Sequence, residues 1–215
     1  MTFFKLPSLQ RLEGKQIVLA SGSPRRKEIL SKLGLEFQVV PSTFPETLDK
    51  STFSHAKDYV TETAKQKTLE VFERLQSSQA QPPALVIGAD TIVVLGEEIL
   101  EKPRSVEHAV EILTRLNGKS HYVYTAVCFA LPHSTQPEIL TFCEETEVVF
   151  ANSSPELIQA YVDSGEPMDK AGGYGYQGLA SFLVSKINGD YYNVVGFPAQ
   201  KFFEKLNELL ENNLI

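Results

Sequence analysis

The sequence is poor in the residues that bind metals through sulfur or imidazole. Its 215 residues include two cysteines, four histidines and no tryptophan. Cys128 and Cys143 lie in apolar, strand-like runs without the spacing of metal ligands, so we expect two small buried hydrophobic residues in a reducing cytoplasm. The histidines form neither an HExxH motif nor a triad-like arrangement, and we assign them no catalytic role.

The chain also lacks an excess of basic charge and a long apolar segment. Its net charge of −7 argues against general nucleic-acid binding, which needs a broad basic face. No run of 18 apolar residues occurs, and the apolar run at the N-terminus is too short for a signal sequence, so we expect no membrane association. With 42% hydrophobic and 22% charged residues, the composition is globular and favours a single domain over residues 1–215.

The order of the predicted elements indicates an α/β fold, with a two-lobed mixed sheet, flanking helices and a central cleft. Hydrophobic patterns predict strands at residues 16–20, 37–40, 84–87, 92–95, 122–131, 139–150, 182–187 and 191–195. Periodicity, capping residues and breakers predict helices at 24–33, about 53–79 with room for one break, 106–116, from 154 onward, and 198–210.

Residues 21–27 follow an apolar strand and open a helix with cations rather than acids. Ser23 is a favourable N-cap and Pro24 a favourable first helical residue, which places Arg25 and Arg26 in the first turn. A helix start carries unpaired N–H groups and the positive end of the helix dipole, so two arginines there predict a bound polyanion that relieves their repulsion. We therefore interpret this segment as a phosphate-binding turn.

Two further residues follow apolar runs. Asp90 comes after residues 84–87, so its carboxylate is expected near the end of a core strand, where α/β proteins bind ligands. An Asx turn or a capping aspartate explains it equally well. Pro103 keeps Lys102 extended, so this lysine can reach a phosphate, although a solvated surface lysine is the more common explanation.

Residues 165–178 combine acids, a lysine and an amide with several glycines. Asp169 and Lys170 lead into this loop, and Gln177 offers a donor and an acceptor that suit the edge of a base. Glycines let backbone N–H groups approach a ligand, but for the glycines alone a structural turn with positive φ is the favoured interpretation. No Walker motif or dinucleotide fingerprint is present.

Glu46 and Lys67 carry little signal by themselves. They are most simply a surface acid and a lysine on a solvated helix face. The phosphate-binding turn upstream makes them candidates for a metal-facing carboxylate and a phosphate-facing lysine.

Four ordered motifs resemble the Maf family of nucleoside triphosphate pyrophosphatases, over about residues 16–205. They are ASGSPRR at 20–26, GADTIV at 88–93, LEKP at 100–103 and EPMDKAGGYGYQG at 166–178. The resemblance implies an elongated α/β fold shared with the inosine triphosphate pyrophosphatases, and a cytoplasmic enzyme that frequently dimerises. It also implies hydrolysis between the α and β phosphates of a nucleoside triphosphate, with Mg²⁺ or Mn²⁺ as cofactor. The chain further resembles the Maf-like half of a vertebrate acetylserotonin methyltransferase-like protein, with no methyltransferase portion expected after Ile215.

The resemblance also suggests residue roles and a substrate group. Arg26, Thr91 and Gln177 are similar to the residues of the dTTP and UTP group rather than the 7-methyl-GTP group. We expect Asp90 to act as general base and Glu46 with Asp90 to bind the metal. The expected substrate-binding residues are Ser21, Arg25, Arg26, Lys67, Thr91, Lys102, Asp169, Lys170 and Gln177.

Other functions stay open at this point. A non-catalytic nucleotide-binding regulator of cell division would use the same phosphate-binding turn, and so would a nucleotidyltransferase or a 7-methyl-GTP pyrophosphatase. A purely structural protein is the least favoured reading, because it leaves Arg25 and Arg26 at a helix start without compensation.

Overall fold

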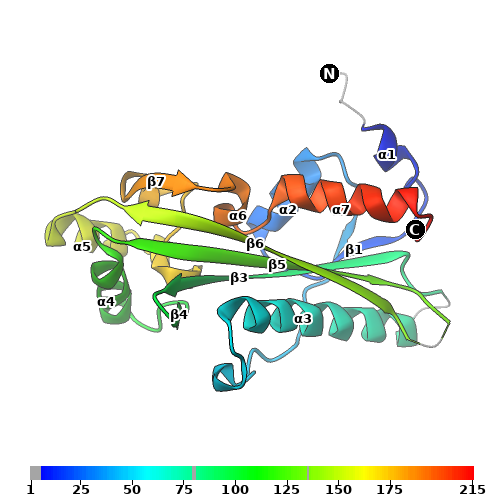
Figure 1. Cartoon of the computed structure of the whole chain (residues 1–215), viewed down its shortest axis with the longest axis horizontal. Helices are drawn as coiled ribbons and strands as arrows, with labels where there is room; N and C mark the ends of the chain where they lie inside the picture. Colours follow the sequence, from blue (N-terminus) through cyan, green and yellow to red (C-terminus); the bar gives the residue numbers. More distant parts are fainter. Residues whose placement is uncertain (1–5, 79–80, 135) are drawn as a thin grey trace. The chain divides into compact units, whose positions relative to one another are not determined.

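The chain divides into two compact units, which are described separately (Figure 1). The computed structural model describes residues 6–78, 81–134 and 136–215. Unit 1 comprises residues 1–90, 126–143 and 197–215, and unit 2 comprises residues 91–125 and 144–196.

Within the described residues, the strands form a seven-stranded sheet of order β2-β1-β3-β5-β6-β7, with β4 paired to β3. Strand β1 is parallel to β2 and β3, whereas the β3–β4 and β6–β7 pairs are antiparallel. The predicted mixed α/β sheet is therefore confirmed. The strands are β1 (Ile17–Leu19), β2 (Gln38–Val39), β3 (Leu85–Leu95), β4 (Glu98–Leu100), β5 (Ser120–Leu131), β6 (Glu138–Phe150) and β7 (Val184–Asn188).

The α-helices are α1 (Pro7–Gln10), α2 (Pro24–Lys32), α3 (Ala56–Ser78), α4 (Val106–Leu116), α5 (Pro155–Asp163), α6 (Tyr191–Val195) and α7 (Ala199–Glu211). The predicted helices appear in the predicted order as α2, α3, α4, α5 and α7, and α1 and α6 were not predicted as helices. The described part of the chain also forms the short 3₁₀ helices η1 (Lys50–Thr52), η2 (Glu166–Asp169), η3 (Ala171–Gly173) and η4 (Leu179–Phe182). Helix α3 starts three residues later than predicted and has no break, and its predicted end at Gln79 lies outside the described residues.

Residues 191–195 form helix α6, so the prediction of a strand there is wrong. The Asp190 side chain caps the helix by accepting a hydrogen bond of 2.8 Å from the Tyr192 N–H. Gly196, with φ of 111°, ends it. These two end signals outweigh the strand propensity of the aromatic and β-branched residues between them.

In unit 1, helices cover both faces of the strands. Helix α3 lies along one face, where Val71 and Phe72 pack with Val18 of β1 (Figure 1). Helix α7 covers the opposite face, where Phe202 contacts Phe129 of β5 with ring centroids 5.6 Å apart. Alternation along the strands explains this arrangement, because successive side chains point to opposite faces.

Strand β3 runs without interruption through residues 88–91, so the prediction of two strands flanking that segment is wrong. Asp90 therefore lies inside a long strand rather than at its end. Gly88 permits this, because a Cβ at residue 88 would lie 2.0 Å from Thr68 Oγ1 of α3. The glycine thus marks a close approach of helix and strand rather than a turn.

Unit 2 has its own hydrophobic core. Helices α4 and α5 pack together in it (Figure 1), with Ile112 and Leu116 of α4 and Ile158 of α5 almost fully buried. His121 Nε2 lies 2.7 Å from the Tyr174 hydroxyl oxygen in this core. Burial lowers the pKa of His121 to about 4, so the imidazole is neutral at physiological pH.

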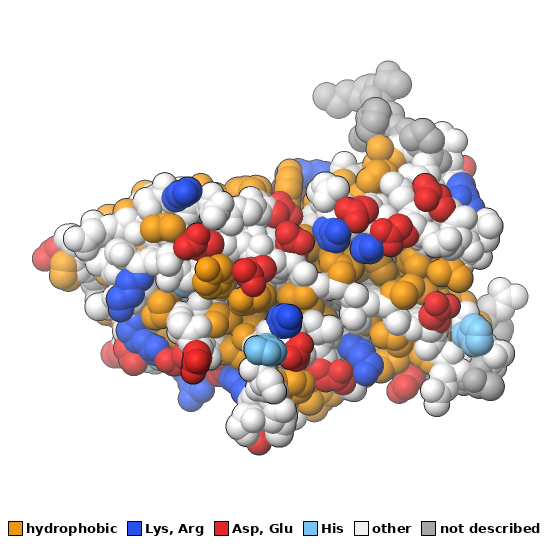
Figure 2. All heavy atoms as spheres, viewed as in Figure 1, with side chains coloured by type: hydrophobic (Ala, Val, Ile, Leu, Met, Phe, Trp, Pro, Cys, Tyr) orange, Lys and Arg blue, Asp and Glu red, His pale blue; other side chains and the backbone are white. Residues whose placement is uncertain are grey.

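The helices and the surface in view were compared with the expectations of no membrane span and no broad basic face. Among the described residues, no helix is both long and apolar enough to span a bilayer. On the face seen in Figure 2, acidic and basic side chains are interspersed outside the grey residues. Both cysteines are thiols, and burial raises the pKa of Cys128 to about 12, which fits a structural role.

Candidate active site

The capped turn predicted before helix α2 forms as expected in unit 1. Ser23 caps helix α2 by accepting a hydrogen bond from the Arg26 N–H, and Pro24 is the first helical residue. The Ser21 hydroxyl oxygen accepts a hydrogen bond of 3.3 Å from the Ser23 N–H, which closes the turn before the helix. Arg25 and Arg26 consequently lie in the first turn of α2, both half-buried.

The Arg26 side chain folds back over this turn toward strand β3. Its Nη1 donates hydrogen bonds to the Ala89 carbonyl oxygen at 2.8 Å and to Ser21 Oγ at 3.1 Å. Burial lowers the pKa of Arg26, and the Asp90 carboxylate opposes that shift. Arg26 therefore has compensation within the protein, which the sequence argument for a bound polyanion did not foresee.

Lys67 joins the two carboxylates that the sequence argument assigned to a metal. Its ammonium nitrogen lies 2.7 Å from Glu46 Oε1 and 2.7 Å from Asp90 Oδ1. The side chains of Lys67 and Asp90 are only 12% and 13% exposed, whereas that of Glu46 is 52% exposed. One ammonium group thus holds an inner and an outer carboxylate together, on residues far apart in the sequence.

This pair of carboxylates has the donor chemistry of a magnesium or manganese site. These cations prefer oxygen ligands and are commonly bound by one or two carboxylates together with substrate phosphates. Among the described residues, no group of three or more His, Cys, Asp or Glu side chains could hold a metal. Glu46 and Asp90 therefore fit a cation that arrives with a nucleotide better than one in an all-protein cage.

Unit 2 contains the other predicted site residues. Asp169 and Lys170 form an ion pair of 2.6 Å, and the Lys170 ammonium also donates to the Glu166 carbonyl oxygen at 2.6 Å. The Thr91 and Thr125 hydroxyl oxygens lie 3.0 Å apart, within hydrogen-bonding distance. The two remaining residues, Lys102 and Gln177, have exposed side chains.

The glycine-rich loop is organised by residues that the sequence argument passed over. Gly172 adopts φ of +66°, and a Cβ there would lie 2.8 Å from Val93, so its glycine is structural as the favoured interpretation held. The Glu166 carboxylate accepts hydrogen bonds from the Tyr161 hydroxyl at 3.1 Å and the Leu179 N–H at 3.0 Å. In the sequence, the only sign of this role was that Glu166 stands at the start of the loop. Its position did not show that Tyr161 and Leu179 are its hydrogen-bond partners.

The chain is similar in sequence to Maf-like proteins and to proteins named as pyrophosphatases. The family model described as "Maf-like protein" matches residues 16–209. A human protein named "Probable bifunctional dTTP/UTP pyrophosphatase/methyltransferase protein" is 50% identical over 207 residues, covering 94% of this chain and 33% of the human protein.

Two relatives named "dTTP/UTP pyrophosphatase" match along most of their own length. The Schizosaccharomyces pombe protein is 40% identical, covering 94% of this chain and 87% of its own. The Thermococcus kodakarensis protein is 44% identical, covering 90% of this chain and 96% of its own. The chain thus spans a third of the human relative but nearly all of these two.

Proposed function

Because the chain belongs to the Maf family, we propose that it hydrolyses dTTP and UTP to the nucleoside monophosphate and pyrophosphate. Relatives from bacteria, archaea and a fungus that carry the name dTTP/UTP pyrophosphatase support this substrate group. Of the two activities in the human protein's name, we propose only the pyrophosphatase for this chain, because the chain spans 33% of that protein.

The observation that carries the proposal is the cluster of Lys67, Glu46 and Asp90 in the same unit as the arginine-rich start of α2. Hydrolysis of a triphosphate requires that water reach a phosphorus atom surrounded by negative oxygens. Cationic groups and a positioned carboxylate meet that requirement without a covalent intermediate. A protein that only binds nucleotide has no need of an acid beside its cations.

The proposed roles follow from the position of each side chain. Ser21, Arg25 and the N–H groups at the start of α2 bind phosphate oxygens, as helix N-termini commonly do. Asp90 orients the attacking water and accepts its proton, because it is the less exposed carboxylate of the pair. Lys67 fixes Asp90 in the absence of nucleotide and offers its charge to the triphosphate when the nucleotide binds.

We propose Mg²⁺ or Mn²⁺ as the cofactor. Glu46 and Asp90 are the residues that would hold it, and when bound it neutralises charge on the phosphate oxygens. Lys102, Asp169 and Lys170 of unit 2 stay predicted substrate-binding residues.

Base recognition is assigned to Arg26, Thr91 and Gln177. Arg26 acts in this proposal by holding the turn at Ser21 in place, as its hydrogen bonds to Ser21 and Ala89 support. Gln177 is exposed and has a donor and an acceptor that match the edge of a pyrimidine.

A nucleotide panel tests the proposal. Purified protein is incubated with dTTP, UTP, 5-methyl-UTP, pseudouridine triphosphate, dCTP, GTP and 7-methyl-GTP, each with Mg²⁺, Mn²⁺ or chelator, and pyrophosphate release is measured. We expect release from dTTP and UTP that depends on the cation. Stoichiometric binding of dTTP without pyrophosphate release would instead indicate a nucleotide sensor, and preference for 7-methyl-GTP would contradict the substrate assignment.

We propose a cytoplasmic homodimer, as the family resemblance implies. Size-exclusion chromatography with light scattering tests the assembly, and a single species at the 23.9 kDa mass of the monomer would contradict it.

A further inference from the structure

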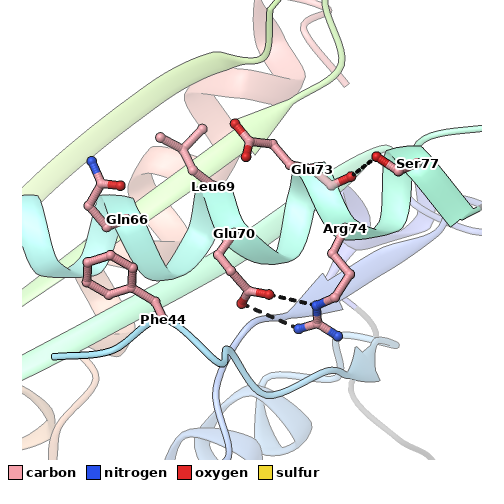
Figure 3. A pocket seen from close by; sticks show the side chains of 7 residues that line it. All are labelled: Phe44, Gln66, Leu69, Glu70, Glu73, Arg74 and Ser77. Carbon is pink, nitrogen blue, oxygen red and sulfur yellow. Dashed lines mark hydrogen bonds and ion pairs between the residues drawn. The ribbon is translucent and has the colours of Figure 1, made fainter.

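The Glu70 carboxylate on α3 collects hydrogen bonds from the segment that follows β2. Its Oε2 accepts from Ser42 Oγ at 2.8 Å and from the Thr43 N–H at 2.9 Å, and its Oε1 accepts from Thr43 Oγ1 at 3.0 Å. Arg74, one helical turn later, donates from Nε to Glu70 Oε1 at 2.7 Å (Figure 3). A single side chain therefore ties two consecutive residues of the segment to the helix.

Arg74 strengthens this attachment from the other side. Its Nη2 donates to the Pro41 carbonyl oxygen at 3.0 Å. The Glu70–Arg74 pair therefore forms hydrogen bonds with three successive residues, 41–43. Burial raises the pKa of Glu70, but hydrogen bonds from Arg74, Thr43 and Ser42 outweigh it and lower the pKa to about 2. Glu70 is consequently ionised, and a full acceptor, throughout the physiological range.

The same segment carries Glu46. Residues 41–49 have no helix or strand, so regular backbone hydrogen bonding does not fix where Glu46 lies. The contact of Glu46 with Lys67 involves a Glu46 side chain that is 52% exposed, and ion pairs of exposed side chains contribute little to stability. Other contacts are therefore needed to fix the position of residues 41–49.

Lys67 and Glu70 are three residues apart on α3 and therefore lie on the same side of the helix. Thr43 and Glu46 are likewise three residues apart on the segment. The helix thus holds the segment at two matched points, with Glu70 binding Thr43 and Lys67 binding Glu46. An open groove of about 490 Å³ adjoins this contact and is lined by Phe44, Gln66, Leu69, Glu70, Glu73, Arg74 and Ser77 (Figure 3).

We propose that Glu70 is a positioning residue for the pyrophosphatase reaction, which it serves by holding residues 41–43 so that Glu46 reaches Lys67, the residue that also contacts Asp90. The inference rests on the proposed function for its effect on turnover. Its structural part, the attachment of the segment to α3, stands on the contacts alone.

The test compares Glu70→Gln with Glu73→Gln. Both glutamates lie on α3 and line the same groove, but of the two only the Glu70 carboxylate has described hydrogen bonds to the segment. Gln keeps the size of Glu while it replaces an acceptor oxygen by an NH₂ group and removes the charge that Arg74 pairs with. Hydrogen–deuterium exchange, kcat and KM for dTTP, and the melting temperature are measured for each variant.

We expect Glu70→Gln to exchange the Thr43 amide faster and to lower kcat/KM about tenfold, because a misplaced catalytic carboxylate costs turnover. Glu73→Gln should match the wild type in both measurements. The decisive arm adds Glu46→Gln: if Glu70 acts through Glu46, then Glu70→Gln should change kcat/KM less than about twofold in that background.

Three outcomes would overturn the inference. They are unchanged exchange of Thr43 in Glu70→Gln, turnover of that variant within twofold of wild type, and fully additive effects of the two substitutions. If Glu70→Gln does not fold, the Ser42→Ala/Thr43→Val variant replaces it, because this variant removes the two hydroxyl groups that donate to Glu70. It should show the same faster exchange of the Thr43 amide and the same loss of kcat/KM. Wild-type protein that releases no pyrophosphate would defeat the proposed function instead, and the exchange arm would still decide whether Glu70 holds the segment.

Discussion

Asp90→Asn separates the proposed chemistry from the stability of the fold. Asn has nearly the shape of Asp and retains the Oδ1 acceptor that Lys67 contacts at 2.7 Å. Lys67 also keeps its ion pair with Glu46, so no buried ammonium is left without a carboxylate. The substitution therefore removes the proposed base and one negative charge that faces Arg26 and the proposed cation, while both contacts of Lys67 are kept.

The two expected magnitudes differ widely. Changing a charged hydrogen bond to a neutral one costs about 1–2 kcal/mol of unfolding free energy, which lowers the Tm of a protein of this size by a few degrees. A positioned general base contributes about 10²–10⁴-fold to the rate, which corresponds to roughly 3–5 kcal/mol of transition-state stabilisation. The variant should therefore be folded at 25 °C and at least about a hundredfold slower.

The assay is pyrophosphate release from dTTP at saturating nucleotide and cation, with thermal unfolding followed on the same samples. Asp163→Asn is the matched control, because this exposed aspartate on α5 accepts one hydrogen bond from Gln159 and has no proposed role. Turnover of Asp90→Asn within about tenfold of wild type would refute the assignment of Asp90 as base.

Two further predictions concern stability. Gly88→Ala should lower the unfolding free energy by about 1–3 kcal/mol, because its Cβ would lie 2.0 Å from Thr68 Oγ1. Thr68→Ala removes that atom, so the double variant should lose less than the sum of the single losses in denaturant titrations, and simple additivity would contradict the explanation. The pKa of His121 is lowered from 6.5 to about 4, so the unfolded state binds the proton first and the unfolding free energy should fall as pH drops from about 6.5 to 4. His121→Phe should reduce that fall in titrations across this range, whereas the exposed control His55→Gln should keep it; an equal fall in the Phe variant would exclude His121 as its source.

Local signals account for the elements that the sequence predicted well. Ser23 and Ser154 each accept a hydrogen bond from the N–H of the third helical residue, and each helix starts where its serine indicated. Helix α4 was predicted with its observed bounds, because its apolar residues recur at helical spacing and Asn117 and Gly118 follow. These signals act within a few residues and need no knowledge of the rest of the fold.

The prediction for residues 88–91 failed because a tertiary contact decides the local structure there. The glycine in β3 looked like a turn, because a sequence does not show that α3 passes within contact distance of residue 88. The attachment by Glu70 was equally hidden: its spacing to Arg74 indicates an ion pair along the helix, but its hydrogen bonds to Ser42 and Thr43 join residues nearly thirty positions apart.

The composition of the candidate site explains how an acidic protein can bind a triphosphate. The chain carries a net charge of −7, yet unit 1 places three cations, Arg25, Arg26 and Lys67, with two carboxylates, Glu46 and Asp90. The local excess is a single positive charge, which is too small to attract a long polyanion but sufficient to favour a compact anion that brings its own cation. Under the proposed function, a nucleotide that arrives with Mg²⁺ or Mn²⁺ would suit this balance, because the cation would offset the negative charge of the phosphates beside Glu46 and Asp90.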